Sequence, residues 1–409
     1  MPENRTKVAF YTFGCKVNLF ETDQLKKSLT SVDIVEENAD IYVINGCTVT
    51  AATDRQVRNM IRRFSRKGRV FITGCYARKD DETLEDLKDV QFFENIEEVA
   101  QYFESEFVFD TVFSRSRPFI KIQSGCDQFC TYCIIPYVRG PLKSVSLNNI
   151  ENLLGKIKRD GFNEVVLTGI HIGKYGKDLK DDKTLGDVAQ LAYETVGRVR
   201  LGSLESPEVD DKLFEMAKQG KVLPHWHIPL QSGCDSVLKK MNRPYTTKDF
   251  ADTVKKLQDC YPQDLAIGTD VIAGFPGETD EEFNETLEFI KSMPFTYGHV
   301  FPFSPREGTK AWDMDKKNAV NGLVKKERAA KLREVFENKR IAFMKSLDKK
   351  LEEVVVEEKG EDGLWTSTSS NFQTVKLNGE LQSGQLVTVR LEFADDELRG
   401  TVVSDRLKT

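Results

Sequence analysis

Three cysteines lie within eight residues in the middle of this 409-residue chain. Cys126, Cys130 and Cys133 follow a segment typical of a β-strand, so their thiolates can wrap a compact soft-metal centre in one loop. A closed zinc site takes four ligands, and the neighbouring sequence offers no fourth. A 4Fe–4S cluster held by three cysteines instead leaves one iron open for a substrate or cofactor. An iron–sulfur centre is favoured, and a zinc site completed from afar or unrelated buried thiols remain alternatives.

Three further cysteines, Cys15, Cys47 and Cys75, share a different context. Each directly follows a glycine, which permits tight turns beside a bulky group. Each also lies just past a segment that predicts a β-strand, and these strands span residues 7–12, 40–44 and 69–73. Because parallel strands end at the same edge of a sheet, we expect the three thiols to converge there. They predict a second, incompletely ligated iron–sulfur centre, although any one of them alone would be read as a buried apolar cysteine.

Strand and helix patterns alternate along most of the chain and must position these cysteines. The first hundred residues, with helices at 21–30 and 51–65, predict a doubly wound parallel α/β domain. After a polar break at 114–118 the rhythm restarts with helices at 147–159, 184–196, 246–257 and 279–292. The strands of this part are expected at 119–123, 164–168, 198–203, 225–230, 265–272 and 297–303. Six strand–helix repeats predict a partial (βα)6 barrel, with functional loops at the carboxyl ends of its strands.

The last part of the chain changes in composition. Residues 316–346 predict one long, charged helix, and Gly, Asn and Asp turns separate the short strands beyond it. Those strands are expected at 353–358, 363–367, 374–377, 385–393 and 400–403. They predict a small antiparallel β-barrel. The expected domains are therefore residues 1–115, 116–345 and 346–409.

Composition restricts the class of protein. The chain is 39% hydrophobic and 30% charged, with a net charge of −6. It has no run of the roughly 20 apolar residues that cross a bilayer and no apolar region typical of a secretory signal. We expect a cytoplasmic protein without a membrane partner, in which eight cysteines argue against a disulfide framework. Basic clusters at 55–67 and 325–340 are either solvated helix faces or local contacts for phosphate.

The sequence resembles two nested families. Cys126–Cys133, with Tyr132 before the last cysteine, resembles the signature of the radical S-adenosylmethionine superfamily, whose open iron binds the methionine moiety and whose chemistry yields a 5′-deoxyadenosyl radical. The whole-chain pattern resembles the methylthiotransferases, which have an N-terminal cluster domain, a radical domain and a C-terminal barrel called TRAM. The matching stretches are TFGCKVN, NGCTVT, VFITGCYA, SGCDQFCTYCIIPYVRG, LTGIHIGKYG, HIPLQSGCD, GTDVIAGFPGE and HVFPFSPREGT.

Two short stretches indicate a branch of that family. GCKVN around Cys15 and CTVT from Cys47 are similar to the MtaB-type branch, which modifies threonylcarbamoyl-adenosine next to the tRNA anticodon. The branches that act on isopentenyl-adenosine and on a ribosomal protein aspartate typically carry GCQMN and GCPKN there, and both remain alternatives, as does a zinc-dependent RNA-binding protein. Two residues depart from the family pattern. Gly46 is expected to change only a local turn, and Cys234 to replace a serine; outside that pattern, Cys260 is expected to be a core residue.

The resemblance implies cofactors and their ligands. It implies two 4Fe–4S clusters, on Cys15, Cys47 and Cys75 and on Cys126, Cys130 and Cys133, together with S-adenosylmethionine. We assign no catalytic residue beyond these cluster ligands. Six residues are candidate contacts for S-adenosylmethionine: Thr168, Gly169, Glu205, Gln231, Arg243 and Asp270. The first four lie at or after strand ends, Arg243 could pair with the carboxylate, and Asp270 belongs to a stretch that resembles the adenine-side segment. Glu205 and Arg243 are alternatively surface ion pairs, and Asp270 alternatively caps the turn around Gly274.

The implied reaction replaces a C–H bond at carbon 2 of the adenine by C–S–CH3. The implied partners are the anticodon stem-loop of tRNA, an electron donor such as a flavodoxin or ferredoxin, and a sulfur source. A stacked base cannot reach both clusters, so we expect it to be splayed out of the loop. Phe372, Trp365 and Arg390 are candidate RNA platforms, with core packing as the alternative for the two aromatic residues.

Overall fold

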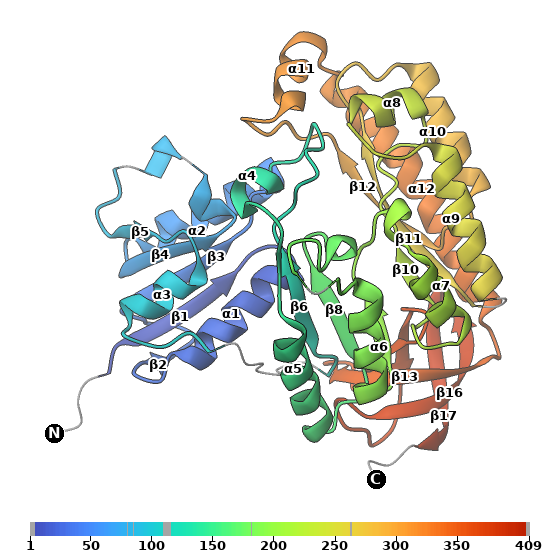
Figure 1. Cartoon of the computed structure of the whole chain (residues 1–409), viewed down its shortest axis with the longest axis horizontal. Coiled ribbons are helices and arrows are strands. Elements are labelled where there is room, and N and C mark those ends of the chain that lie inside the picture. Colours follow the sequence, from blue (N-terminus) through green and yellow to red (C-terminus); the bar gives the residue numbers. More distant parts are fainter. Residues whose placement is uncertain are drawn as a thin grey trace. The chain divides into compact units, whose positions relative to one another are not determined.

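A computed structural model describes residues 5–79, 81–84, 86–108, 116–180, 182–261 and 264–405 (Figure 1). The chain divides into two compact units. The first comprises residues 1–112, 124–142 and 304–312, and the second comprises residues 113–123, 143–303 and 313–409. Of the expected break at 114–118, residues 114 and 115 lie outside the described residues. The division into three domains stays a prediction.

The first unit contains a five-stranded sheet in the order β2-β1-β3-β4-β5, in which every strand pair is parallel. Its strands are β1 (Lys7–Thr12), β2 (Asp33–Ile34), β3 (Ile41–Gly46), β4 (Arg69–Gly74) and β5 (Val90–Phe92). Its principal helices are α1 (Lys16–Ser28), α2 (Ala51–Phe64), α3 (Ile96–Tyr102) and the short α4 (Ile135–Arg139). Helix α1 begins directly after Cys15, several residues earlier than the sequence predicts.

Helices cover both faces of this sheet (Figure 1). Leu25 of α1 and Val99 of α3 pack in one core with Val43, whereas Ile61 of α2 packs in a second core with Ile44. Neighbouring residues of a strand point to opposite faces, so Val43 and Ile44 serve different cores. The predicted doubly wound arrangement is confirmed.

The second unit contains six parallel strands in chain order. They are β6 (Phe119–Ser124), β8 (Val165–Gly169), β9 (Val199–Leu201), β10 (His225–His227), β11 (Ala266–Ala273) and β12 (Tyr297–Pro302), with the short β7 (Lys143–Ser144) beside β6. Between β9 and β10, the Leu223 amide donates to the Val199 carbonyl and the Leu204 amide to the His227 carbonyl. These bonds connect two otherwise separate ladders, so the predicted partial barrel is confirmed.

The second unit contains several helices, most of which begin directly after a capping residue. They are α5 (Leu147–Arg159), α6 (Leu185–Val196), α7 (Asp211–Lys218), α8 (Asp235–Lys240), α9 (Thr247–Cys260), α10 (Asp280–Ser292) and α12 (Gly322–Ser346). Thr184, Thr246 and Thr279 each form a capping box with an acidic residue three positions later, which explains why α6, α9 and α10 were predictable. The helix expected at 316–346 is instead two, α11 (Lys310–Asn318) and α12, because Asn321 caps a new start.

The C-terminal strands form a closed barrel in the order β13-β14-β15-β17-β16. They are β13 (Leu351–Lys359), β14 (Trp365–Ser369), β15 (Thr374–Leu377), β16 (Leu386–Ala394) and β17 (Glu397–Asp405). The prediction of a wholly antiparallel barrel is wrong in one pair, since β15 and β17 run parallel. Strand direction cannot alternate all the way around a closed ring of five, so one parallel pair is unavoidable. Across the part of the chain that the structure describes, no helix has both the length and the apolar character needed to cross a bilayer.

Candidate functional site

Cys15, Cys47 and Cys75 lie at one edge of the first sheet. The β3–β4 register aligns Gly46 with Gly74, so Cys47 and Cys75 each stand one residue past an aligned pair. Burial raises the pKa of the Cys47 thiol to about 11, and the nearby thiols of Cys75 and Cys15 add to this rise. The three thiols therefore converge as the parallel arrangement predicts, while their role as ligands stays a prediction.

The glycines before these cysteines are required for two different reasons. Gly14 and Gly74 have φ values of 121° and 83°, in the left-handed region that favours glycine. Gly46 instead lies within β3, where a Cβ atom would come 2.7 Å from the Cβ of Tyr76. The expectation that Gly46 affects only a turn is therefore wrong, because close packing of the strand against Tyr76 demands the missing side chain.

Two buried asparagines hold the start of α1 against β3. Asn18 donates from Nδ2 to Asn45 Oδ1 over 2.7 Å, and Asn45 donates from its own Nδ2 to the Asn18 carbonyl over 3.0 Å. The Cys15 thiol donates to Asn18 Oδ1 over 3.4 Å. Buried amides that satisfy one another fix a single arrangement of the chain. Through them the position of Cys15 is coupled to the end of β3, where Cys47 follows.

Arg139 of α4 also reaches this edge, and sequence reasoning missed it. Its Nε donates to the Cys75 sulfur over 3.0 Å, its Nη1 to Glu21 Oε1 over 2.5 Å and its Nη2 to Asn18 Oδ1 over 3.3 Å. Its side chain is only 8% exposed. Burial raises the pKa of the Cys75 thiol, and the Arg139 cation opposes that rise. A signal existed, because Arg139 is the only charged residue between Cys133 and Lys143.

Cys126, Cys130 and Cys133 lie in an irregular loop that closes on itself. The Cys126 amide donates to the Gly140 carbonyl over 3.0 Å, and the Cys133 amide donates to the Cys130 carbonyl over 3.0 Å. Gly125 has a φ of 73°, and a Cβ there would overlap the Pro141 carbonyl. Residues 125–126 and 140–141 thus clamp the two ends of the loop and orient its cysteines.

The number of thiols bears on the zinc alternative. A closed structural zinc site takes four protein ligands, whereas each triad supplies three thiols. Three thiolates suit an iron–sulfur cluster that keeps one iron position open. The donor count therefore favours iron–sulfur clusters over structural zinc.

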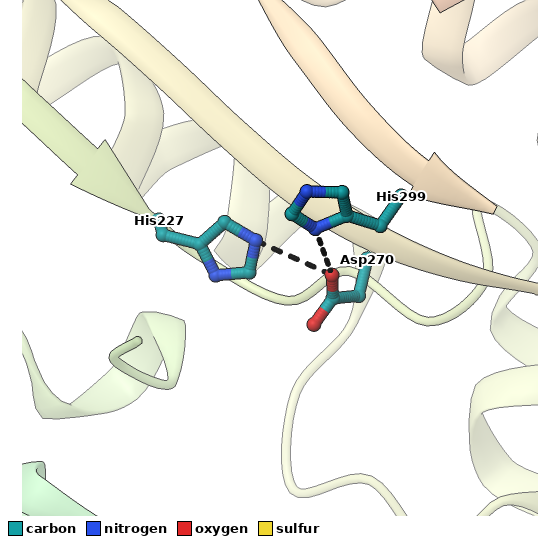
Figure 2. A group of neighbouring side chains, drawn as sticks. All are labelled: His227, Asp270 and His299. Atoms are coloured by element: carbon teal, nitrogen blue, oxygen red, sulfur yellow. Dashed lines mark hydrogen bonds and ion pairs between the residues drawn. The ribbon is translucent and has the colours of Figure 1, made fainter. Parts of the chain in front are cut away.

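His227, Asp270 and His299 come together on three neighbouring strands of the second unit (Figure 2). Asp270 Oδ1 lies 3.0 Å from His299 Nδ1 and 3.3 Å from His227 Nε2. The other nitrogen of His227 lies 2.9 Å from Ser203 Oγ. Burial raises the pKa of the Asp270 carboxyl, but the hydrogen bonds from the two imidazoles outweigh it and hold this pKa below its usual range.

This group lies on the face of the strands that points away from the surrounding helices. Trp226, next to His227, is fully buried and its Nε1 donates to the hydroxyl of Tyr261, directly after α9. Gly298, next to His299, faces Phe336 of α12. Because side chains alternate along a strand, both histidines belong to the inner face of the partial barrel. Sequence reasoning missed them, although polar residues two apart in otherwise buried strands were a signal.

The remaining candidate contacts lie at or after strand ends. Thr168 and Gly169 end β8, where a Cβ on Gly169 would come 2.6 Å from the Gln123 carbonyl oxygen. Glu205 and Arg243 form an ion pair, but Arg243 is only 2% exposed, so the pair is buried rather than a surface one. A buried pair is costly to break. The two residues therefore brace the loops after β9 and α8 against each other.

Gln231 and Asp270 are neighbours, since the Gln231 amide donates to the Asp270 carbonyl over 2.8 Å. Asp270 does not cap the turn at Gly274, whose amide donates to Glu278 Oε2 over 2.9 Å, so that alternative is wrong. Thr168 and Gly169 lie two strands away from β10 in the sheet order. The structure thus joins the other four candidates into two pairs and leaves Thr168 and Gly169 on a separate strand.

The candidate RNA platforms are mainly packing residues. The Phe372 ring lies 4.3 Å from the His225 ring, with the Arg200 guanidinium 5.2 Å from it. Trp365 packs against the core of the C-terminal barrel. Arg390 is exposed and donates to the Lys349 carbonyl over 3.2 Å. Core packing accounts for Trp365. Phe372 is half-buried and also lines a groove, and Arg390 is exposed.

The chain resembles known proteins along almost its whole length. Residues 120–290 match the radical SAM superfamily, and residues 7–93 match the uncharacterized protein family UPF0004. The threonylcarbamoyladenosine tRNA methylthiotransferase MtaB of Aquifex aeolicus is 37% identical over 94% of this chain and 99% of its own. The MtaB of Bacillus subtilis is 35% identical over 94% and 93%. The tRNA-2-methylthio-N(6)-dimethylallyladenosine synthase of Fervidobacterium nodosum is 31% identical over 94% and 96%.

Solved structures share the fold at low identity. The radical S-adenosylmethionine methyltransferase TsrM of Kitasatospora setae aligns with a TM-score of 0.55 and 10% identity, covering 73% of this chain and 75% of its own. The cobalamin-dependent radical enzyme OxsB aligns with a TM-score of 0.51 and 12% identity, covering 80% of this chain and 56% of its own. At this identity, the solved structures show the fold alone. The full-length relatives at 37% and 35% identity show the family, and the chain belongs to the radical S-adenosylmethionine methylthiotransferases.

Proposed function

We propose that this chain inserts a methylthio group at carbon 2 of threonylcarbamoyl-adenosine, next to the anticodon of tRNA. The observation that carries this proposal is full-length likeness to relatives named for that tRNA nucleoside, at up to 37% identity. The motifs around Cys15 and Cys47 support the same branch. A relative named for dimethylallyladenosine is somewhat less similar, at 31%, so that nucleoside is the alternative substrate.

This family uses two 4Fe–4S clusters and S-adenosylmethionine. We assign one cluster to Cys15, Cys47 and Cys75 and the other to Cys126, Cys130 and Cys133. When bound, these groups supply an electron, a radical able to abstract hydrogen from an aromatic carbon, and a methylated sulfur. The donor set fits, because each site offers three thiols and leaves one further iron position open. No side chain needs to act as a general base at carbon 2.

The chain's own residues orient these groups. At the strand-edge site, which is formed by Cys15, Cys47 and Cys75, Cys47 and Cys75 are buried and Cys15 is exposed. Arg139 donates to the Cys75 sulfur, and such a hydrogen bond to a ligand sulfur stabilises its charged form and tunes the bound metal. The Asn18–Asn45 pair fixes Cys15 beside them. Together these contacts fix the side chains around the strand-edge site.

Contacts to S-adenosylmethionine and to other partners remain part of the proposal. Thr168, Gly169, Glu205, Gln231, Arg243 and Asp270 are the candidates for the former. Of these, Gly169 offers backbone at a strand end, and Arg243 offers a buried guanidinium that Glu205 holds in place. The anticodon stem-loop is the proposed RNA partner, with a flavodoxin or ferredoxin as electron donor, a separate sulfur source and a cytoplasmic location. The three-domain division, with a TRAM-like barrel from residue 346, belongs to the same proposal.

Product formation in vitro tests the substrate assignment. The full-length chain is reconstituted with iron and sulfide under anaerobic conditions and given stem-loops that carry either threonylcarbamoyl-adenosine or isopentenyl-adenosine. We expect a methylthio product from the first RNA only, detected by nucleoside mass spectrometry. Cys260→Ser is the matched control, because Cys260 lies outside both triads at the end of α9 and should retain activity. Product from the isopentenyl RNA alone would overturn the assignment.

A further inference from the structure

The two ring nitrogens of His299 have different surroundings. Nδ1 contacts Asp270, and Nε2 points away from Asp270 (Figure 2). Nδ1 lies 3.0 Å from Asp270 Oδ1, and Figure 2 shows the second nitrogen on the side of the ring away from Asp270. We propose that His299, held by Asp270, is a substrate-positioning residue that donates a hydrogen bond from Nε2 to an anionic oxygen of the RNA substrate. This inference rests on the proposed function and names a contact within it.

His227 contacts Asp270 from the side opposite His299, so the Asp270 carboxylate is fixed and in turn fixes the orientation of the His299 ring. His227 Nε2 lies 3.3 Å from the same Oδ1 atom, and Ser203 Oγ lies 2.9 Å from His227 Nδ1. The chain of contacts therefore runs from Ser203 to His299 across three strands. The hydrogen bond with Asp270 raises the pKa of His299, although burial opposes it. A protonated imidazole carries a hydrogen on both nitrogens, so Nε2 can donate while Nδ1 stays bonded.

Exposure increases along this group towards the edge of the sheet. The side chain of His227 is 11% exposed, that of Asp270 25% and that of His299 58%. Strand β12 is the last strand in the order β10-β11-β12, so His299 stands at an open edge. Phe301, two residues further along the same face, is 44% exposed, and its ring lies 6.4 Å from that of His299. An exposed aromatic ring beside a fixed donor is suited to a nucleotide.

A groove of about 360 Å3 opens beside His299, between β12, α12 and the C-terminal barrel. Its walls include the rings of Tyr297 and Phe372 and two cations, Arg340, which pairs with Glu337, and Lys376, which pairs with Asp362. Asp396 and Glu397 also line it, so the groove is not uniformly cationic. The volume is in the range of small-ligand sites. It therefore leaves room for part of a nucleotide next to the Nε2 donor.

Two parts of the proposed substrate carry the required anionic oxygen. One is the carboxylate of the threonyl side chain, which a dimethylallyl or isopentenyl side chain lacks. The other is a backbone phosphate, which every RNA presents. A contact to the carboxylate would make His299 a specificity-determining residue, whereas a contact to phosphate would fix only the position of the RNA. Both sources use the same donor, and RNAs that differ only in the carboxylate separate them.

The test measures RNA affinity of the reconstituted full-length enzyme by fluorescence anisotropy. Three labelled stem-loops are compared, which carry threonylcarbamoyl-adenosine, its methyl ester or unmodified adenosine. His299→Gln should weaken binding of the carboxylate RNA about tenfold, the value expected for one hydrogen bond between charged groups, and leave the ester unchanged. Asp270→Asn should weaken the same RNA less. Lys248→Gln, on α9 and outside both basic clusters, has a side chain that is 82% exposed and is the matched control, so it should change nothing.

The outcomes separate this inference from the proposed function. An equal loss for all three RNAs, with a weaker salt dependence, would assign the anion to a phosphate. Unchanged affinity of His299→Gln for every RNA would overturn the inference, provided that the variant keeps its thermal stability and cluster absorption. A wild-type enzyme that discriminates the carboxylate RNA but forms no methylthio product would instead contradict the proposed function alone.

Discussion

The two cysteine triads are built in opposite ways. Cys126, Cys130 and Cys133 come from one loop, whose ends are clamped by backbone contacts at Gly125 and Gly140. Cys15, Cys47 and Cys75 come from three strand ends and meet only when β1, β3 and β4 pair in parallel. The loop is a local device that spacing alone reveals. The strand-edge site forms only in the folded sheet, so the positions of its three cysteines depend on how β1, β3 and β4 pair and pack.

The two sites are also connected. Arg139 belongs to the segment that closes the loop of the first triad, yet its guanidinium donates to Cys75 of the second. It further contacts Glu21 and Asn18 on α1, directly behind Cys15. A buried cation with three partners is fixed in one orientation. The state of the loop can therefore affect the environment of the strand-edge site.

The largest effect should come from the loop triad. Replacing Cys126, Cys130 and Cys133 with Ala removes every ligand of the proposed radical cluster, so we expect cleavage of S-adenosylmethionine to fall at least about a hundredfold, to background. Chromatography of 5′-deoxyadenosine under anaerobic, reducing conditions measures this loss. Cleavage at the wild-type rate in the triple variant would show that this loop does not hold the radical cluster.

Replacing Cys15, Cys47 and Cys75 with Ala should abolish methylthio transfer but preserve cleavage of S-adenosylmethionine. The loop site keeps its ligands, so 5′-deoxyadenosine should form within about tenfold of the wild-type rate, whereas methylthio product should be absent. Mass spectrometry of the RNA and chromatography of 5′-deoxyadenosine from the same reaction give both values. Product at the wild-type level would contradict the role of the strand edge in sulfur insertion.

Arg139→Gln should have a smaller effect, confined to the strand-edge site. The variant loses the charged donor to Cys75, and loss of a hydrogen bond to a metal ligand typically costs about 10- to 100-fold in affinity or activity. We expect the methylthio product to fall in that range, with a shifted electron paramagnetic resonance signal of the strand-edge cluster and an unchanged signal of the loop cluster. Lys26→Gln, a cation in the same unit whose ammonium lies 5.6 Å from the centre of the Phe10 ring, is the control. Equal signals in Arg139→Gln and wild type would remove the proposed connection.

Asn45→Ala should weaken the contact between α1 and β3 that positions Cys15, without removing a cysteine. It leaves the buried amide of Asn18 without its partner, which costs about 1–3 kcal/mol in the free energy of unfolding. Because the pair couples α1 to β3, retention of iron at the strand edge should fall while the loop cluster is retained. Denaturant unfolding gives the first value. Iron analysis gives the second for each site, in one background with Cys126, Cys130 and Cys133 replaced by Ala and in another with Cys15, Cys47 and Cys75 replaced. A loss of iron at the loop alone would contradict the comparison.

The sequence predicted features that depend on local signals. The capping boxes at Thr184, Thr246 and Thr279 explain the accurate helix starts, and glycine before cysteine explains the strand-edge hypothesis. Features that depend on register or on closure were not predictable in this way. The contact of Arg139 with Cys75 joins distant segments, and the parallel β15–β17 pair follows from closing five strands into a ring.

The inner-face histidines illustrate the same limit. His227 and His299 were part of quoted motifs, but neither was assigned a role because their shared partner, Asp270, lies on the strand between them. Asp270 itself was chosen as a cofactor contact from its motif alone. Only the pairing of β10, β11 and β12 brings the three side chains together. Side-chain partners across strands are set by register, which spacing along the chain does not contain.

The most direct test of the central claim is nucleoside mass spectrometry of tRNA from a strain that lacks this protein. Loss of the reaction should remove 2-methylthio-threonylcarbamoyl-adenosine and cause threonylcarbamoyl-adenosine to accumulate, and re-expression of the intact chain should restore the methylthio form. Re-expression of the variant with Cys15, Cys47 and Cys75 replaced by Ala should not restore it. An unchanged level of 2-methylthio-threonylcarbamoyl-adenosine in the strain without the protein would contradict the assignment.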